Sequence, residues 1–135
     1  MQVKRRRGIV AEEKILVVDD EKDVVDLLEK RLSAENFEVI RASTGREAME
    51  RTRKARPHLI LMDIVLPDME GSEAVRQLAE DPLTKDIPVL FLSGIISKEE
   101  ELAQPQINVG GRLYKAISKP FAFEELLGEI RKVLG

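Results

Sequence analysis

Short apolar segments that lead directly into a charged or hydroxyl residue occur four times in this chain, and this repetition constrains its fold most strongly. The segments are Ile15–Val18, Leu59–Met62, Val89–Leu92 and Tyr114–Ser118, and they are followed by Asp19 and Asp20, Asp63, Ser93 and Lys119. Apolar runs this short are typical of strands buried on both faces of a parallel sheet. Because the ligand crevice of such a sheet lies beyond the carboxyl ends of its strands, the polar residues mark the predicted site.

Between these runs the apolar positions follow a helical period. The predicted strands cover residues 15–18, 37–42, 59–62, 87–92 and 113–118, and the predicted helices cover 23–32, 45–54, 72–79 and 123–134. Strands that alternate with helices in this way require right-handed crossovers and helices on both faces of the sheet. The sequence therefore predicts an α/β fold built on one doubly wound, five-stranded parallel sheet.

The composition predicts one folded domain with a short basic extension. The chain has 135 residues, no cysteine and a net charge of −3. Four adjacent basic residues, Lys4 to Arg7, lie in the predicted N-terminal extension over residues 1–12, and residues 8–135 carry a net charge of −7. We expect a flexible extension without an assigned role and a folded domain over residues 13–135. With no disulfide framework, no signal-peptide core and no apolar stretch long enough for a membrane span, the expected location is the cytoplasm, away from the membrane.

The polar residues at the strand ends predict phosphoryl chemistry with a divalent cation. Asp63 is a candidate nucleophile, since a carboxylate that attacks phosphorus forms an acyl phosphate. Asp19 and Asp20 place two further carboxylates nearby, and two such charges ~4 Å apart repel by ~4 kcal/mol at an effective dielectric of about 20. A cation is therefore needed, and Mg²⁺ fits best because it prefers hard oxygen ligands. Lys119 would stabilise charge on the transferring group, and the Ser93 hydroxyl would bond a phosphoryl oxygen.

Each residue also has a simpler interpretation. Asp20 could cap the following helix, Asp63 could bond to loop amides, Ser93 could be a turn former, and Lys119 could be a surface lysine. His58 is the single histidine. It precedes the third strand, at the end opposite to the predicted site, so a role as phosphocarrier is not expected.

Taken together in this order, the motifs resemble those of the response-regulator receiver domains, the CheY-like family of two-component signalling. The matching motifs are Asp19-Asp20, the segment from Asp63 to Gly71, Ser93-Gly94 and Lys119-Pro120-Phe121. The resemblance covers about residues 13–135 and implies a flavodoxin-like sheet of strand order 2-1-3-4-5. It further implies that Asp20, Asp63 and the backbone carbonyl of Val65 ligate Mg²⁺, that Asp19 acts through a bound water, and that the bond before Pro120 is cis.

Two features depart from the family pattern. The family usually has an aromatic switch residue three positions before the lysine, whereas this chain has Ala116, with Tyr114 two residues earlier. The stretch between Ser93 and Lys119 is also long. Within it, residues 97–104 predict only a short fourth helix, which Pro105 ends, and residues 105–111 are expected to be loop-like.

The resemblance implies a phosphoacceptor that takes a phosphoryl group on Asp63 from a sensor histidine kinase or a histidine phosphotransfer protein. Such a domain is not an enzyme on other substrates, although it catalyses its own phosphorylation and dephosphorylation. Its expected effect is to switch contacts with a downstream target protein, with no direct binding of nucleic acid. The alternatives are a degenerate receiver that serves as a constitutive interaction module, and a Mg²⁺-dependent phosphoester hydrolase on the same fold.

Overall fold

The computed structural model describes residues 12–94, 99 and 106–135. The helices and strands in these residues are β1 (Lys14–Val18), α1 (Lys22–Ala34), β2 (Glu38–Ala42), α2 (Gly45–Ala55), β3 (Leu59–Asp63), α3 (Gly71–Glu80), β4 (Val89–Ser93), β5 (Gln106–Val109), β6 (Arg112–Ser118) and α5 (Phe123–Leu134). The sheet has the strand order β2-β1-β3-β4-β6-β5. Its first five strands are parallel, and β6 occupies the place of the predicted fifth strand, so the flavodoxin-like order is confirmed.

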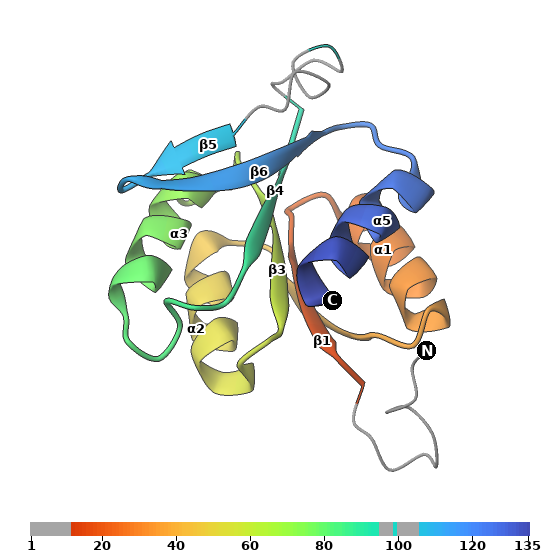
Figure 1. The fold of residues 1–135 in the computed structure, drawn as a ribbon, viewed down its shortest axis with the longest axis horizontal. Coiled ribbons are helices and arrows are strands. Elements are labelled where there is room, and N and C mark those ends of the chain that lie inside the picture. The colour runs from red at the N-terminus through yellow and green to blue at the C-terminus, as the bar shows by residue number, and fades with distance from the viewer. Residues whose placement is uncertain (1–11, 95–98, 100–105) are drawn as a thin grey trace.

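Helices cover both faces of the sheet. Figure 1 shows α1 and α5 on one side of the strands and α2 and α3 on the other. Alternate residues of β1 reach the two layers: Ile15 and Val17 belong to the apolar cluster on the α1 and α5 side, and Leu16 and Val18 to the cluster on the α2 and α3 side. Burial of every strand residue from Ile15 to Val18 explains why the strand is a continuous apolar run.

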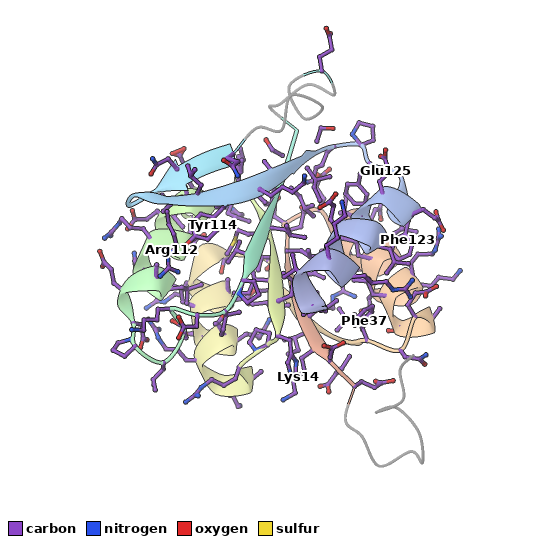
Figure 2. All side chains as sticks on the ribbon, viewed as in Figure 1. Lys14, Phe37, Arg112, Tyr114, Phe123 and Glu125 are labelled. Atoms are coloured by element: carbon purple, nitrogen blue, oxygen red, sulfur yellow. The ribbon has the colours of Figure 1, made fainter. Side chains whose placement is uncertain are left out.

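The helices form where the sequence supplies an apolar face. Val25, Leu28 and Leu32 are the buried residues of α1, one turn or so apart, and they pack on the sheet. On the same side, Phe37 and Phe123 lie near α1 and α5, whereas Tyr114 lies on the other side of the sheet (Figure 2). No helix in the described residues is long and apolar enough to span a membrane.

The expectation that residues 105–111 form a loop is wrong for most of that segment. β5 pairs with β6 in antiparallel fashion, which makes the sheet of the described residues six-stranded and mixed. Gly110 and Gly111 connect the two strands with φ angles of 60° and 91°. Two central residues with positive φ suit the right-handed twist of a hairpin, and glycine adopts this conformation without steric cost.

Burial explains why β5 forms. Ile107 and Val109 alternate with polar residues and join the apolar cluster on the α2 and α3 side. Tyr114, opposite Ile107 in the ladder, packs edge-on against Phe91 with the ring centroids 5.8 Å apart. The strand therefore covers the edge of the sheet next to α3.

Residues 97–98 and 100–104, on which the prediction of a short fourth helix rests, lie outside the described residues, as does the basic segment over residues 4–7.

Candidate functional site

The parallel strands bring the predicted residues to one edge of the sheet. Asp63 is the last residue of β3 and Ser93 the last of β4, while Asp19 and Lys119 directly follow β1 and β6. The registers align these ends, because Val18 lies opposite Met62 and Ser93 lies opposite Ser118. Residues separated by up to 100 positions in the chain therefore meet at one place, as the strand-end pattern predicts.

Three carboxylates form the centre of the site. Asp19, Asp20 and Asp63 each offer an oxygen atom, and these atoms all lie within 4.8 Å of one another. Asp19 and Asp63 are buried, with 1% and 6% of their surface exposed, whereas Asp20 is exposed. A set of carboxylate oxygens that is closed on one side and open on the other suits a hard cation that keeps some of its water ligands, as Mg²⁺ does. The donor set thus fits the predicted metal.

Lys119 lies between the carboxylates. Its Nζ atom is 2.7 Å from an oxygen of Asp19, 3.3 Å from one of Glu21 and 3.5 Å from one of Asp63. The main-chain N–H of Lys119 donates to the carbonyl of Ser93 at 2.8 Å, which ties the end of β6 to the end of β4. The Lys119–Pro120 peptide bond is cis, as the resemblance implies. With 14% of its side chain exposed, Lys119 is not a free surface lysine.

The electrostatics of the site follow from burial and crowding. Burial, followed by the charge of Asp19, raises the pKa of Asp63 above its usual range, although Lys119 and the N–H of Val65 act in the opposite direction. Burial by itself would lower the pKa of Lys119, but the hydrogen bond and charge of Asp19 and the charge of Asp63 outweigh it, so the pKa of Lys119 is raised. Lys119 therefore remains a cation, and the carboxylates carry an excess of negative charge that a metal would neutralise.

An open cavity of about 400 Å³ gives access to this edge. Its lining comes from the loops after β1, β3, β4 and β6 and consists of Asp20, Glu21, Asp63, Val65, Leu66, Pro67, Gly94 and Lys119. Val65 is 61% exposed at the cavity, and within the described residues no atom lies within 4 Å of the position that a Cβ on Gly94 would take. Ser93 itself is fully buried. A small phosphoryl donor can therefore approach Asp63 from the side of Val65 and Gly94.

The segment after Asp63 is held in a tight turn. Val65 forms an isolated antiparallel bridge with Glu70, and the N–H of Gly71 donates to the carbonyl of Ile64 at 2.6 Å. A Cβ on Gly71 would lie 2.1 Å from the carbonyl oxygen of Asp63, so this close approach requires glycine. The turn places Val65 beside the carboxylates.

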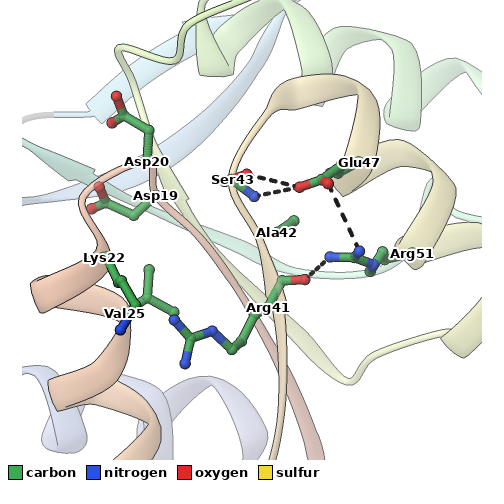
Figure 3. A pocket seen from close by; sticks show the side chains of 9 residues that line it. All are labelled: Asp19, Asp20, Lys22, Val25, Arg41, Ala42, Ser43, Glu47 and Arg51. Atoms are coloured by element: carbon green, nitrogen blue, oxygen red, sulfur yellow. Dashed lines mark hydrogen bonds and ion pairs between the residues drawn. The ribbon is translucent and has the colours of Figure 1, made fainter.

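A second cavity of about 240 Å³ lies beside the carboxylates, between α1, β2 and α2. Figure 3 shows Asp19 and Asp20 on one side of it, Glu47 and Arg51 on the opposite side, and the guanidinium of Arg41 beside Val25. Its arginines already have partners: Arg41 pairs with Asp26 and Glu29 of α1, and Arg51 contacts Glu47 and the carbonyl of Arg41. Because these cations are neutralised within the domain, the cavity offers little attraction to an anionic ligand.

Some simpler interpretations of the site residues find no support. The N-cap residue of α1 is Glu21, and it is the carboxylate of Asp19 that accepts the N–H of Glu21 at 2.9 Å, so Asp20 does not act solely as a helix cap. His58 accepts the N–H of Lys14 at 2.9 Å at the amino end of β3, away from the site.

Sequence reasoning missed Glu21 as a partner of Lys119. Its position next to Asp20, where the chain leaves the strand end, is the only signal that could have indicated it.

Comparison with known proteins agrees with the fold. The profile of the response regulator receiver domain matches residues 15–131. The alkaline phosphatase synthesis transcriptional regulatory protein PhoP of Bacillus subtilis is 35% identical over 122 residues, which are 90% of this chain and 48% of that protein. The response regulator MprA of Mycolicibacterium vanbaalenii is 36% identical over 121 residues, 90% of this chain and 50% of the relative. The chain thus spans about half the length of these curated relatives.

Solved structures give the same result. The chemotaxis protein CheY4 of Vibrio cholerae superposes with a TM-score of 0.77 at 32% identity, covering 92% of this chain and 100% of that one. A putative response regulator from Chloroflexus aurantiacus has a TM-score of 0.78 at 28% identity, covering 91% and 98%. The doubly wound sheet with a carboxylate cluster at its carboxyl edge, together with these matches, is that of a receiver domain. The chain belongs to the response regulator receiver domain family, whose members function in two-component signalling.

Proposed function

We propose that residues 13–135 form a phosphoacceptor that takes a phosphoryl group on Asp63 and thereby switches protein contacts. The donor is a phosphohistidine of a sensor histidine kinase or of a histidine phosphotransfer protein. An oxygen of the Asp63 carboxylate attacks phosphorus, the new P–O bond forms as the P–N bond breaks, and the electron pair leaves on the imidazole nitrogen. Water later attacks the phosphorus and returns Asp63 and inorganic phosphate.

The observation that carries this proposal is the position of Lys119. Its ammonium group lies 3.5 Å from Asp63 at the open cavity, where it can bond an oxygen of an incoming phosphoryl group. A preplaced cation stabilises the charge of a transferring phosphoryl group without further reorganisation. In the proposal Ser93 bonds a second phosphoryl oxygen, which requires the buried hydroxyl to turn toward the cavity.

Mg²⁺ would be held by Asp20, Asp63 and the backbone carbonyl of Val65, with Asp19 acting through a water ligand. When bound, it neutralises the carboxylates and the charge of the phosphoryl group. Support comes from the cluster of three carboxylates, because burial of Asp19 and Asp63 makes their excess negative charge costly without a cation.

The switch that we propose does not use an aromatic ring at position 116. Ala116 is completely buried, and the nearby ring of Tyr114 is packed against Phe91. The signal therefore has to leave the site through backbone and loop movements.

The Bacillus relative is named as a transcriptional regulator, and its length is about twice that of the match. An output of that kind is not part of the proposal for residues 13–135.

Labelling with a small phosphodonor tests the proposal. We expect incubation with acetyl phosphate and Mg²⁺ to add one phosphoryl group, located on the peptide that contains Asp63, and we expect Asp63→Asn or removal of Mg²⁺ with EDTA to prevent it. Labelling of the variant on another peptide would refute the assignment. Folded protein that is never labelled would favour the interaction module, and repeated turnover of small phosphate esters would favour the hydrolase.

A further inference from the structure

Two sets of side-chain acceptors cap the N–H groups at the start of α2, one local and one from a distant loop. The local half comes from its own sequence: Thr44 accepts the N–H of Glu47 at 3.0 Å, and Glu47 accepts the N–H of Ser43 at 2.8 Å. This is the reciprocal arrangement of a capping box, displaced by one residue. It leaves the N–H groups of the first two helical residues, Gly45 and Arg46, without a local partner.

Asp68 supplies the second half from a distant loop. One oxygen of its carboxylate accepts the N–H of Gly45 at 2.8 Å, and the other accepts the N–H of Arg46 at 3.0 Å. These two hydrogen bonds span more than 20 positions of sequence and place a negative charge at the positive end of the helix dipole. The hydrogen bond from Gly45 is the largest of the influences that lower the pKa of Asp68, so the carboxylate is ionised at neutral pH.

Contact between the two elements is close. A Cβ on Gly45 would lie 2.5 Å from Cγ of Met69, so the absence of a side chain at Gly45 allows Met69 to pack directly on the start of α2. The loop between Asp63 and Gly71 is thus held by β3, by the bridge between Val65 and Glu70, by the hydrogen bond from Gly71 to Ile64, by the buried side chains of Ile64 and Leu66, and by α2 through Asp68. Val65, Pro67 and Asp68 are otherwise exposed.

We propose that Asp68 is a positioning residue for the phosphoacceptor site, because its paired hydrogen bonds to α2 hold the loop that carries Val65 in the geometry that the site needs. This inference rests on the proposed function. Asp68 lies five residues after Asp63 and three after Val65, in the exposed part of a loop that is otherwise held by the bridge of Val65 to Glu70, the hydrogen bond from Gly71 to Ile64 and the buried side chain of Leu66. Without the anchor, only these contacts hold Val65, and in the proposal its position relative to the carboxylates then shifts. A displacement of about 1 Å at a reacting group can cost up to about 100-fold in rate.

The two halves of the cap provide a matched pair of variants. Asp68→Ala removes the hydrogen bonds from the loop, whereas Thr44→Ala removes the local cap and leaves the loop anchored. Both variants should lower the midpoint of thermal unfolding by similar amounts, since each deprives the same helix end of acceptors. Only Asp68→Ala should slow labelling by acetyl phosphate, by about three- to tenfold, and weaken Mg²⁺ binding measured by calorimetry. Asp68→Asn retains one acceptor oxygen and should give an intermediate rate.

Two results would overturn the proposal: labelling and Mg²⁺ binding of Asp68→Ala that equal those of wild type, or losses in Thr44→Ala as large as those in Asp68→Ala. If Asp68→Ala does not fold, the comparison is made between Asp68→Asn and Thr44→Ala with the same criteria. A wild-type protein that is not labelled at Asp63 refutes the proposed function instead. In that case the order of Mg²⁺ affinities among these proteins still tests whether Asp68 positions the loop.

Discussion

Removing the charge of Asp63 should stabilise the metal-free domain, although Asp63 is the centre of its site. At an effective dielectric of about 20, the carboxylates of Asp63 and Asp19 repel by about 3.5 kcal/mol if their oxygens are 4.8 Å apart, and Asp63 and Lys119 attract by about 4.7 kcal/mol at 3.5 Å. Repulsion from the exposed Asp20 is smaller because solvent screens it. The attraction to Lys119 and the repulsion from the other carboxylates nearly cancel. Burial therefore decides the balance, and it makes the ionised form of Asp63 unfavourable.

We therefore expect Asp63→Asn to raise the free energy of unfolding by about 1–2 kcal/mol at pH 7 in EDTA. Because the folded-state pKa of Asp63 is raised above its unfolded value of 3.8, the folded protein binds this proton more tightly. The cost of the ionised carboxylate is thus fully present above the folded-state pKa. It disappears as the pH falls through that pKa toward 3.8.

Urea denaturation of wild type and Asp63→Asn, with EDTA and with saturating Mg²⁺, measures this difference. The advantage of the variant should shrink or reverse in Mg²⁺, because only the wild type has the complete set of carboxylates. Asp81→Asn is a control of opposite sign, since the N–H of Leu83 and the charge of Arg53 lower the pKa of Asp81. The reasoning is refuted if Asp63→Asn is less stable than wild type in EDTA, or if Mg²⁺ stabilises both proteins equally.

Two further substitutions probe the same edge of the sheet. Lys119→Met should lower the free energy of unfolding in EDTA by roughly 3 kcal/mol, because it leaves buried carboxylates without their cation. Because the pKa of Lys119 is raised, the stability that its charge contributes is present at pH 7 and is lost only as the pH rises through the folded-state pKa. Equal urea midpoints for the variant and the wild type at pH 7 would contradict this expectation. Gly71→Ala should cost about 1–3 kcal/mol through overpacking against the carbonyl of Asp63. It should also slow phosphodonor labelling, and a variant with wild-type stability and labelling rate would show that the close approach is not required.

The local pattern of apolar residues was sufficient to predict the parallel strands and the polar residues at their carboxyl ends. A strand buried on both faces has to be apolar throughout, so runs such as Leu59–Met62 are visible in the sequence without any knowledge of the partner strands. The residue after such a run necessarily lies at the carboxyl edge. For this reason the positions of Asp19, Asp63, Ser93 and Lys119 could be predicted from the order of the chain, before any contact was known.

The hairpin of β5 and β6 was visible in part and was misread. Alternation of Ile107 and Val109 with polar residues, followed by Gly110 and Gly111, is a hairpin pattern. Pro105 and the expectation of a helix before it favoured a loop instead. The segment becomes a strand because its apolar residues pack beside α3, and this gain depends on the tertiary arrangement.

Only the tertiary structure decided the contacts between distant polar groups. Glu21 contacts Lys119 because the end of β6 lies beside the start of α1, and Asp68 caps α2 because the loop after β3 crosses its first turn. The raised pKa of Asp63 likewise depends on how closely Asp19 approaches and how much of the pair is buried. Hydrophobic periodicity is local and can be read along the chain. Hydrogen bonds and charge interactions depend on distances of a few ångströms, which exist only after the strands and helices have packed.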